Sequence, residues 1–552
     1  MKTLLYILLG STTLLIFVVL GIERWLGNRL RRAAEKTLAE QTGGAVRLTV
    51  GRVGVSLWRR TVTLGDLTLR TDTSRLAAVL PGVKAVEADI FRISLRHIRF
   101  RFGKTTPERP KYLSLGAVEI DALRLVCTAN GEPSSDSSGT LSAQRLQELV
   151  CRRLGSLAVE RIALHRGEVQ VVEPGHNRYS VKGLTIRAAG LRIAPDTPPE
   201  TRPLFCDDLR ITARKASVHF LVTAQLLEAG PVDLALRDER FSLRNIRLVP
   251  QYGKAEYAWK TEHHTDWTLV LASGVEAEGV DFGRLWREGS VCVVRLSVRD
   301  AEVANFKNRR IVRRERFKPL WHEMIHRLPF GLEVGSVEIV NARVVYEELA
   351  ATGTTPGRIS FDDLNGALRG LTNRPSSPDS MYTLTASGKV MNTGQLRVVV
   401  RIPAHPSNDR FEAEGTLGPM SLDLFNRILQ PLADAGVRTG RLEGLSFSVS
   451  GNSRTAQSTV KMRYSDLSVR LWRRDGEGRG HERKWASGFV NLLVIRSSNP
   501  DRKGFRTPRR TVERDPLRSQ FNYLWRGLLG GIKESVGLPE TSAAVSSAER
   551  KK

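Results

Sequence analysis

The chain has 552 residues, of which 41% are hydrophobic, and its 85 Lys and Arg against 58 Asp and Glu leave a net charge of +27. This hydrophobic content excludes a disordered basic tail, and the length suits several domains or one long repeat array. The positive charge favours anionic partners such as lipid head groups, lipopolysaccharide or nucleic acid, with a generally Arg-rich composition as the alternative.

An uninterrupted apolar run extends from Thr3 to Ile22. Twenty uncharged residues span about 30 Å as a helix, which is enough to cross the hydrocarbon core of a bilayer. The run is longer than the apolar region of an ordinary signal peptide, and no A-x-A-like cleavage site follows it. We therefore expect an uncleaved single-pass anchor over residues 1–25, with a cleaved signal peptide as the alternative.

The charges around this run give a conflicting orientation. Lys2 precedes it and five basic residues between Arg24 and Lys36 follow it, so the positive-inside rule would place the rest of the chain in the cytoplasm. The same basic residues fall in a predicted amphipathic helix over 26–42, which gives them another purpose. The apolar side of that helix carries Leu26, Leu30, Ala33 or Ala34, and Leu38.

From residue 43 onward the hydrophobic pattern has a period of two. In the segment 396–402, alternate positions are Leu, Val, Val and Ile, with Arg397 and Arg401 on the opposite face. This pattern predicts antiparallel strands that cover a single apolar surface. A weak repeat, with Val-Glu at Val118, Val159 and Val337, favours an array of strand–turn–strand units over a closed globule.

Helical spacing interrupts the strands at 141–154, 319–328, 421–435 and 519–538. The last segment is the most amphipathic and predicts either a lid packed on the final strands or a helix on a membrane surface. Its apolar stripe comprises Phe521, Leu524, Trp525, Leu528, Leu529 and Ile532. The small, polar tail over 539–552 is expected to be disordered.

Little in the sequence resembles an active site. Segment 322–326 has the H-E-x-x-H pattern of zinc proteases, but we expect His322, Glu323 and His326 on the solvent side of a short helix that Pro329 ends. Cys127, Cys151, Cys206 and Cys292 lack metal-binding spacing, and a Cys127–Cys151 disulfide or four thiols are both open. We expect no enzyme activity, no metal and no cofactor.

Several stretches together form a pattern that is shared with a known family. They are the apolar run followed by Gln41-Thr-Gly-Gly44, residues 52–58, 65–69, 417–426 and 440–447, and Tyr464-Ser-Asp-Leu467. On these stretches the chain resembles the AsmA-like family of Gram-negative envelope proteins. Residues 521–525 (Phe-Asn-Tyr-Leu-Trp) are similar to the shorter, Bacteroidetes-type members.

The resemblance implies a single-pass inner-membrane anchor and a β-rich body in the periplasm, against the positive-inside rule. It also implies an elongated, curved, U-shaped sheet with an apolar groove, similar to bridge-like lipid-transfer proteins such as TamB. The implied function is phospholipid transport between the inner and outer membranes and homeostasis of the outer membrane. The expected partners are phospholipids, the membrane and outer-membrane or envelope proteins, without nucleic acid.

The predicted organisation follows from the pattern and the resemblance together. It comprises an anchor over 1–25, a juxtamembrane helix over 26–42, an N-terminal β-groove over 43–310, a linking helix over 311–330, a C-terminal AsmA-like β-groove over 331–475, a basic segment with the amphipathic helix over 476–538, and the tail over 539–552.

Alternation turns one set of apolar residues toward the predicted groove, where an ordinary core is the alternative. These lipid-groove residues are Val62, Leu64, Val118, Ile120, Leu184, Ile186, Val398, Val400, Leu445, Phe447 and Val449. A second hypothesis for the function is a non-transporting scaffold or assembly factor for outer-membrane proteins, which would use exposed strand edges as a template.

Overall fold

The computed structural model describes residues 23–40, 42–79, 83–102, 110–129, 147–148, 150–152, 155–196, 203–261, 265–311, 317–474, 480–482 and 495–538. The apolar run, the tail and most of the helix expected over 141–154 lie outside these residues. The described helices include none that is long and apolar enough to cross a membrane. The chain is mainly β, with 58% strand and 18% helix, and its strands form a large mixed sheet.

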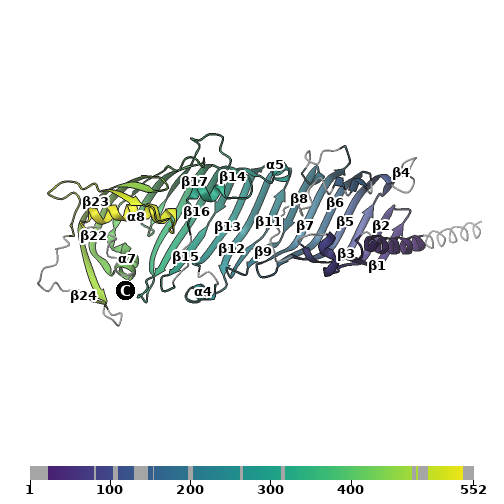
Figure 1. Cartoon of the computed structure of the whole chain (residues 1–552), viewed down its shortest axis with the longest axis horizontal. Helices are drawn as coiled ribbons and strands as arrows, with labels where there is room; N and C mark the ends of the chain where they lie inside the picture. The colour runs from purple at the N-terminus through teal and green to yellow at the C-terminus, as the bar shows by residue number, and fades with distance from the viewer. Residues whose placement is uncertain are drawn as a thin grey trace, which may run out of the picture. The chain divides into compact units, whose positions relative to one another are not determined.

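The fold divides into two compact units, and many of their strands and helices are labelled in Figure 1. The first comprises the chain up to Asn245 together with Asp281–Glu288, and the second comprises Ile246–Val280 and the chain from Gly289 onward. The linking helix predicted over 311–330 falls within the second unit.

The first unit contains a helix over 23–40 and a series of long and short strands. Its elements are β1 Val46–Ser56, β2 Thr61–Thr71, α2 Thr73–Val79, β3 Val83–Arg96, β4 Arg99–Phe102, β5 Pro110–Ala129, β6 Leu157–Glu173, β7 Asn177–Ile193, η2 Pro203–Phe205, β8 Asp208–Ala213, β9 Lys215–Phe220, β10 Gln225–Ala229, β11 Val232–Ala235 and α5 Phe282–Glu288, with β12 Arg240–Pro250 crossing the unit boundary.

The second unit contains further strands and most of the helices. Its elements are α4 Lys254–Lys260, β13 Trp267–Val280, β14 Val291–Arg299, β15 Glu302–Asn308, α6 Trp321–His326, β16 Leu332–Leu349, β17 Gly357–Thr372, β18 Met381–Val390, β19 Gly394–Pro403, β20 Phe411–Leu417, β21 Met420–Ser421, η3 Leu422–Phe425, α7 Asn426–Ala433, β22 Ala435–Gly451, β23 Thr455–Arg474, β24 Gly480–Glu482, β25 Arg509–Glu513 and α8 Gln520–Ser535.

The expected purely antiparallel sheet is wrong in detail, because three of the strand pairings described in the structure are parallel. Strand β5 pairs with β6 in parallel, and β16 pairs in parallel with both β14 and β15. A parallel pair needs a long connection that returns the chain to the same end of the sheet. The chain supplies such connections at residues 130–156 and 309–331, which precede the two strands that carry the later Val-Glu repeats.

A line of β-bulges crosses the strands of the first unit. At each bulge a residue adopts a positive φ, as Asp66 in β2 (52°), Ala122 in β5 (52°) and Arg166 in β6 (55°) do. Pairing is interrupted there, for example at Phe91 and Ala122 between the pairs Ile90–Leu123 and Arg92–Asp121, where each strand carries an extra residue and the register is the same on both sides. Because a bulge bends its strand and increases the local twist, an aligned row of bulges creases the sheet.

Bulges also explain why some apolar residues are three positions apart in the sequence, a spacing that strict alternation does not predict. The apolar residues Leu64 and Leu67 are three positions apart, with Gly65 and Asp66 between them. The extra residue of the bulge returns both leucines to the same face of the sheet. The same step of three separates Ile120 from Leu123, Val181 from Leu184, Phe361 from Leu364 and Tyr464 from Leu467.

In the second unit, side-chain hydrogen bonds connect the bulges of neighbouring strands. Asp300, at φ 48°, accepts from the Ser273 hydroxyl at 2.7 Å and from the Asn341 amide at 2.7 Å. These two hydrogen bonds lower the pKa of the Asp300 carboxyl. Farther along the line, Lys389 pairs with Asp363 at 2.7 Å. Short polar side chains therefore stabilise the positive φ values and connect adjacent strands.

We expect the crease to be sensitive to the residue type at Ala122. A β-branched residue at positive φ is strained, so Ala122→Val should lower the free energy of unfolding by about 1–2 kcal/mol, whereas Ala122→Gly should be tolerated. Ala163→Val, at a regular position of β6, is the matched control and should be near neutral. Denaturant unfolding followed by circular dichroism measures all three, and equal losses for both valine variants would contradict the prediction.

Candidate functional site

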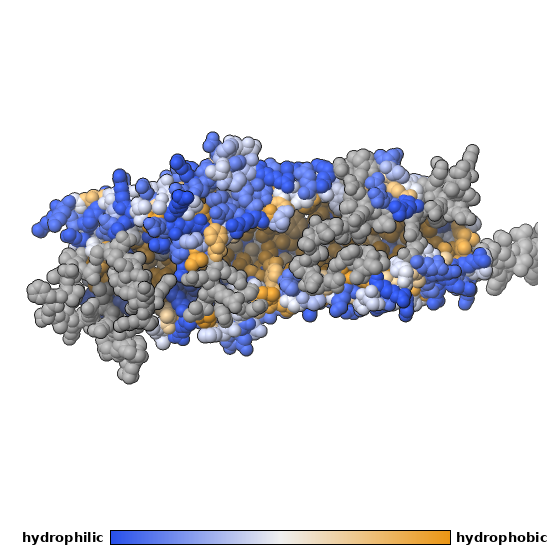
Figure 2. All heavy atoms as spheres, in the orientation of Figure 1, coloured by the Kyte–Doolittle hydropathy of each residue, from blue (hydrophilic) through white to orange (hydrophobic). Residues whose placement is uncertain are grey.

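One face of the first unit is apolar across nine hydrogen-bonded strands. Its central row runs from β1 through β2, β3, β5, β6, β7, β8 and β11 to β12 and consists of Val53, Leu64, Ile93, Ile120, Leu164, Ile186, Ile211, Leu234 and Phe241. Directly paired residues point to the same side of a sheet, so these nine side chains form one continuous stripe. Figure 2 shows hydrophobic surface recessed between hydrophilic margins over these strands.

The groove residues predicted in this unit all lie on that face. Leu64, Ile120 and Ile186 belong to the central row. Val62 and Val118 belong to the next row, in which each pairs with Leu95 of β3. Leu184 is on the same strand and the same face as Ile186, opposite Gly167. The structure brings these six residues together, although they come from three separate strands.

The apolar side chains of this face are only half-buried. All six predicted groove residues have intermediate exposure, and so do Val53, Ile93, Ile211, Leu234 and Phe241. Fully buried members such as Leu164 are the exception. The helix over 23–40 contacts the row at its first member, where a Cβ at Gly27 would lie 3.6 Å from the Val53 side chain. Beyond that strand, the face keeps large aliphatic side chains half-buried, with less cover than an ordinary core has.

The opposite face carries arginine–carboxylate pairs between neighbouring strands. Arg52 bonds Asp66 at 2.6 Å, and Asp121 accepts from Arg166 at 2.6 Å and from Arg92 at 3.4 Å. The Arg166 hydrogen bond is the main cause of the lowered pKa of the Asp121 carboxyl. Part of the arginine excess is therefore paired within the fold.

The second unit has an equivalent apolar row over nine strands, but here helices cover part of it. The row consists of Val275, Val298, Ile339, Gly366, Ala386, Val398, Gly415, Phe447 and Val460. Three of its central members are Gly or Ala, and the Phe447 ring fills the space that a Cβ at Gly415 would need. Helix α8 packs on β23, β25 and β22, beyond Phe447.

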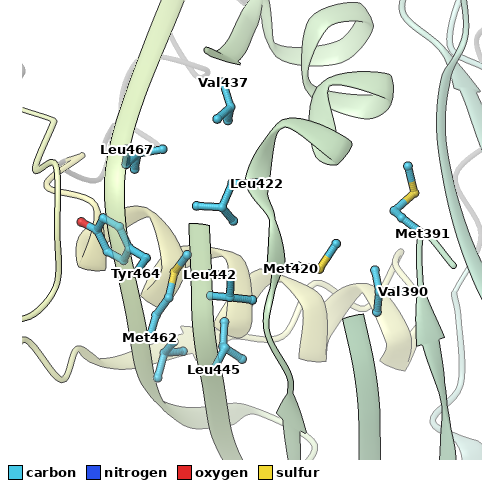
Figure 3. Close-up of a cluster of buried hydrophobic side chains, with 11 residues drawn as sticks. Val390, Met391, Met420, Leu422, Val437, Leu442, Leu445, Met462, Tyr464 and Leu467 are labelled. Carbon is cyan, nitrogen blue, oxygen red and sulfur yellow. The ribbon is translucent and has the colours of Figure 1, made fainter. Parts of the chain in front are cut away.

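Three of the predicted groove residues in this unit lie in a packed hydrophobic core. Leu445 belongs to the cluster in Figure 3, and Val400 and Val449 belong to a second cluster with Tyr382 and Tyr523. Their exposed fractions are 7, 5 and 3%. Val398 and Phe447 are half-buried against these clusters. Burial raises the pKa of Tyr523 to about 12 and that of Tyr382 further still, so both tyrosines stay neutral.

Helix α8 packs on the final strands, as the lid alternative predicted. Its buried side carries Tyr523, Gly527, Gly531 and Ser535, four residues apart along the helix. Of the predicted apolar stripe, Leu528 and Ile532 pack against one hydrophobic cluster and Leu524 packs against the other. Leu529 is half-buried, and Phe521 and Trp525 remain exposed.

A hollow of about 690 Å³ is lined by residues of β17, β18, β19, β20 and β22. Its lining combines members of the central row, such as Val398 and Phe447, with polar residues of the neighbouring positions, such as Thr385, Ser387 and Arg397. The large apolar side chains two positions away from the central row, such as Leu384 and Leu396, do not line it.

The H-E-x-x-H segment has structural partners. Contrary to the expected solvent-facing position, His322 is 6% exposed. Glu323 accepts from the backbone N–H of Leu320 at 2.8 Å, and His326 Nε2 is 2.6 Å from the Ala404 carbonyl oxygen. The helix is only six residues long and packs on more than one side, which a helical-wheel argument misses. Among the described residues, no group of three metal-ligating side chains occurs.

The cysteines do not form the disulfide that was considered. Cys127 and Cys151 are separate thiols, and Cys206 and Cys292 are buried. Burial raises the pKa of the Cys127, Cys151 and Cys206 thiols, which disfavours the reactive thiolate.

Two strand edges are occupied by side chains and loops. Along β1, Glu35 accepts from the backbone N–H of Val50 at 2.9 Å, and just after the strand Glu23 accepts from that of Leu57 at 2.7 Å. Along β23, the backbone of Tyr464 pairs with Asn499 at 2.9 and 3.1 Å. Covered edges resist pairing with another chain.

No protein-family model matches the chain, and no curated protein sequence matches it. The function is therefore inferred from the geometry.

The close contact of α8 gives a matched pair of glycine substitutions. A Cβ at Gly531 would overlap Cγ2 of the fully buried Val460, so Gly531→Ala should lower the free energy of unfolding by about 1–3 kcal/mol. At Gly530 the atom nearest to an added Cβ is 3.9 Å away. Gly530→Ala should therefore raise the free energy of unfolding by as much as about 1 kcal/mol, because Ala has a higher helix propensity than Gly. Thermal unfolding of the two variants measures the difference. Equal changes in stability for Gly531→Ala and Gly530→Ala would refute the close contact between Gly531 and Val460.

Buried His322 should make the fold sensitive to acid. Burial is the main cause of its lowered pKa, so the unfolded chain takes up the proton first as the pH falls below about 6.5. The stabilisation by neutral His322 is present above that pH and is lost below it. The unfolding free energy of His322→Gln should therefore fall less between about pH 7.5 and 5.5 than that of the wild type. His165→Gln on the surface is the control, and parallel profiles for wild type and His322→Gln would contradict this assignment.

Proposed function

We propose that the protein binds lipid acyl chains along the apolar face of its first unit, as a membrane-anchored lipid-transfer protein. The observation that carries the proposal is the central row of nine aliphatic and aromatic side chains, which are mostly half-buried. An apolar sheet face requires a second layer or a ligand, and an extended acyl chain matches a continuous stripe.

The chemistry of the face fits a ligand without directional groups. The central row offers CH₂ and CH₃ surface and no hydrogen-bonding side chain, while the charged pairs lie on the opposite face. Each methylene moved from water to such a surface contributes about 0.8 kcal/mol, so a lipid tail would gain affinity from length rather than from one contact. Such binding tolerates different acyl chains and allows movement along the row.

The location forms part of the same proposal. The apolar run over 3–22 and the resemblance to the AsmA-like family support an inner-membrane anchor, with the body in the periplasm of a Gram-negative bacterium. Phospholipid movement between the two membranes is the function this placement supports. The scaffold hypothesis has less support, because the described edges of β1 and β23 are already bonded.

The test places charge on the apolar face and, as a matched control, on the polar face of the same strands. Leu64→Glu with Ile186→Glu should reduce the lipid that co-purifies with the full-length protein by about tenfold or more, since carboxylates oppose acyl chains in an apolar site. Thr63→Glu with Thr185→Glu adds the same charge on the other side of β2 and β7 and should retain the lipid.

Native mass spectrometry with lipid extraction provides the measurement, and circular dichroism shows whether each variant is folded. These positions are preferable to Val400 or Val449, whose burial in the core would couple lipid loss to unfolding. A folded wild-type protein that carries no lipid, or equal lipid on both double variants, would refute the proposal.

A further inference from the structure

The turn between β1 and β2 presents an unusual surface. Trp58 is 94% exposed at the tip of this turn, beside Leu57 at 49%. Arg59 and Arg60 follow, and both are exposed. A hairpin tip needs no tryptophan for its own stability, and a side chain this exposed contributes no packing. An exposed tryptophan next to arginines is typical of proteins that contact the interface of a lipid bilayer.

The turn is held beside the residue that follows the apolar run. The carboxylate of Glu23 accepts from the backbone N–H of Leu57 at 2.7 Å, and the run ends at Ile22. The helix over 23–40 lies against β1. Gly27 allows this close approach, because a Cβ at Gly27 would be only 3.3 Å from the carbonyl oxygen of Val53. The hairpin tip is therefore fixed at the end of the helix from which the apolar run emerges.

The same end of the helix carries a second aromatic and more positive charge. Trp25 is 56% exposed, and the Arg29 guanidinium lies 4.5 Å from its ring centre. Arg24 is exposed as well. Two tryptophans and several arginines thus lie near the same end of the helix. In the described part of the chain, no carboxylate pairs with Arg59 or Arg60, in contrast to the paired arginines of the polar face.

We propose that Trp58 and the turn 57–60 insert into the head-group region of the bilayer that holds the apolar run, with Arg59 and Arg60 against anionic lipid phosphates. This inference rests on the membrane anchor of the proposed function. The contact would orient β1, the first strand of the apolar row, at the membrane surface. Lipid tails would then reach the row directly from the leaflet, without crossing water.

The test uses the full-length protein in phosphatidylcholine–phosphatidylglycerol vesicles that contain brominated acyl chains, which quench nearby tryptophans. Trp58→Phe with Trp25→Phe should remove roughly a third to a half of the quenched fluorescence, because both rings lie at the interface. Trp259→Phe, in α4 and 64% exposed, is the matched control and should leave the quenched fraction unchanged. Arg59→Gln with Arg60→Gln should weaken the quenching of Trp58 only when phosphatidylglycerol is present.

The outcomes separate this inference from the proposed function. Full-length protein that fails to float with vesicles would refute the anchor and this contact together. A second outcome is that the protein floats and binds lipid, but Trp58→Phe and Trp259→Phe reduce the quenching equally. This would overturn the hairpin contact and leave the proposed function standing. Unchanged thermal unfolding of Trp58→Phe would confirm that the ring has no role in packing.

Discussion

The structure depends on a line of β-bulges that crosses each unit. A straight strand with alternating residues would lie flat, with one apolar face open to water. Each bulge bends its strand and adds one residue, so the apolar residues on both sides of the bend keep the same face. Positive φ values at Asp66, Ala122, Arg166, Asn341 and Asp363 mark these positions. Because neighbouring bulges are in register, the bends combine into a crease.

The crease makes the cover of the apolar face the central energetic question. In the second unit, α8 and the neighbouring short helices bury part of the face in two hydrophobic clusters. In the first unit, the described residues leave aliphatic side chains half-buried along nine strands. A soluble fold rarely retains so long a stripe of this kind without a ligand or partner. The two units thus combine a packed core with a face that is suited to acyl chains.

The strong positive charge has more than one role. Arginines on the polar face pair with carboxylates of adjacent strands, as Arg52 does with Asp66, and such exposed pairs add orientation more than stability. Arg506, within the basic segment, bonds Asp501 and the Ser535 carbonyl and holds the chain beside α8. The arginines of the β1–β2 turn differ, because they project with Trp58 and suit an anionic surface.

The sequence by itself determined the β-rich class, the one-sided apolar pattern and the strand positions of the predicted groove residues, because a period of two is a local property. Only the tertiary structure decided which of those residues are covered: Val400 and Val449 are buried in a core, whereas Leu64 and Ile120 are half-exposed. The parallel pairings, the buried position of His322 and the glycine contact of α8 also depend on elements far apart in the chain.

The apolar step of three residues around Asp66 or Asp363 was a local signal for the bulges. Its consequence, a crease, follows only when pairing aligns one bulge with the next, and that alignment is set by register between strands.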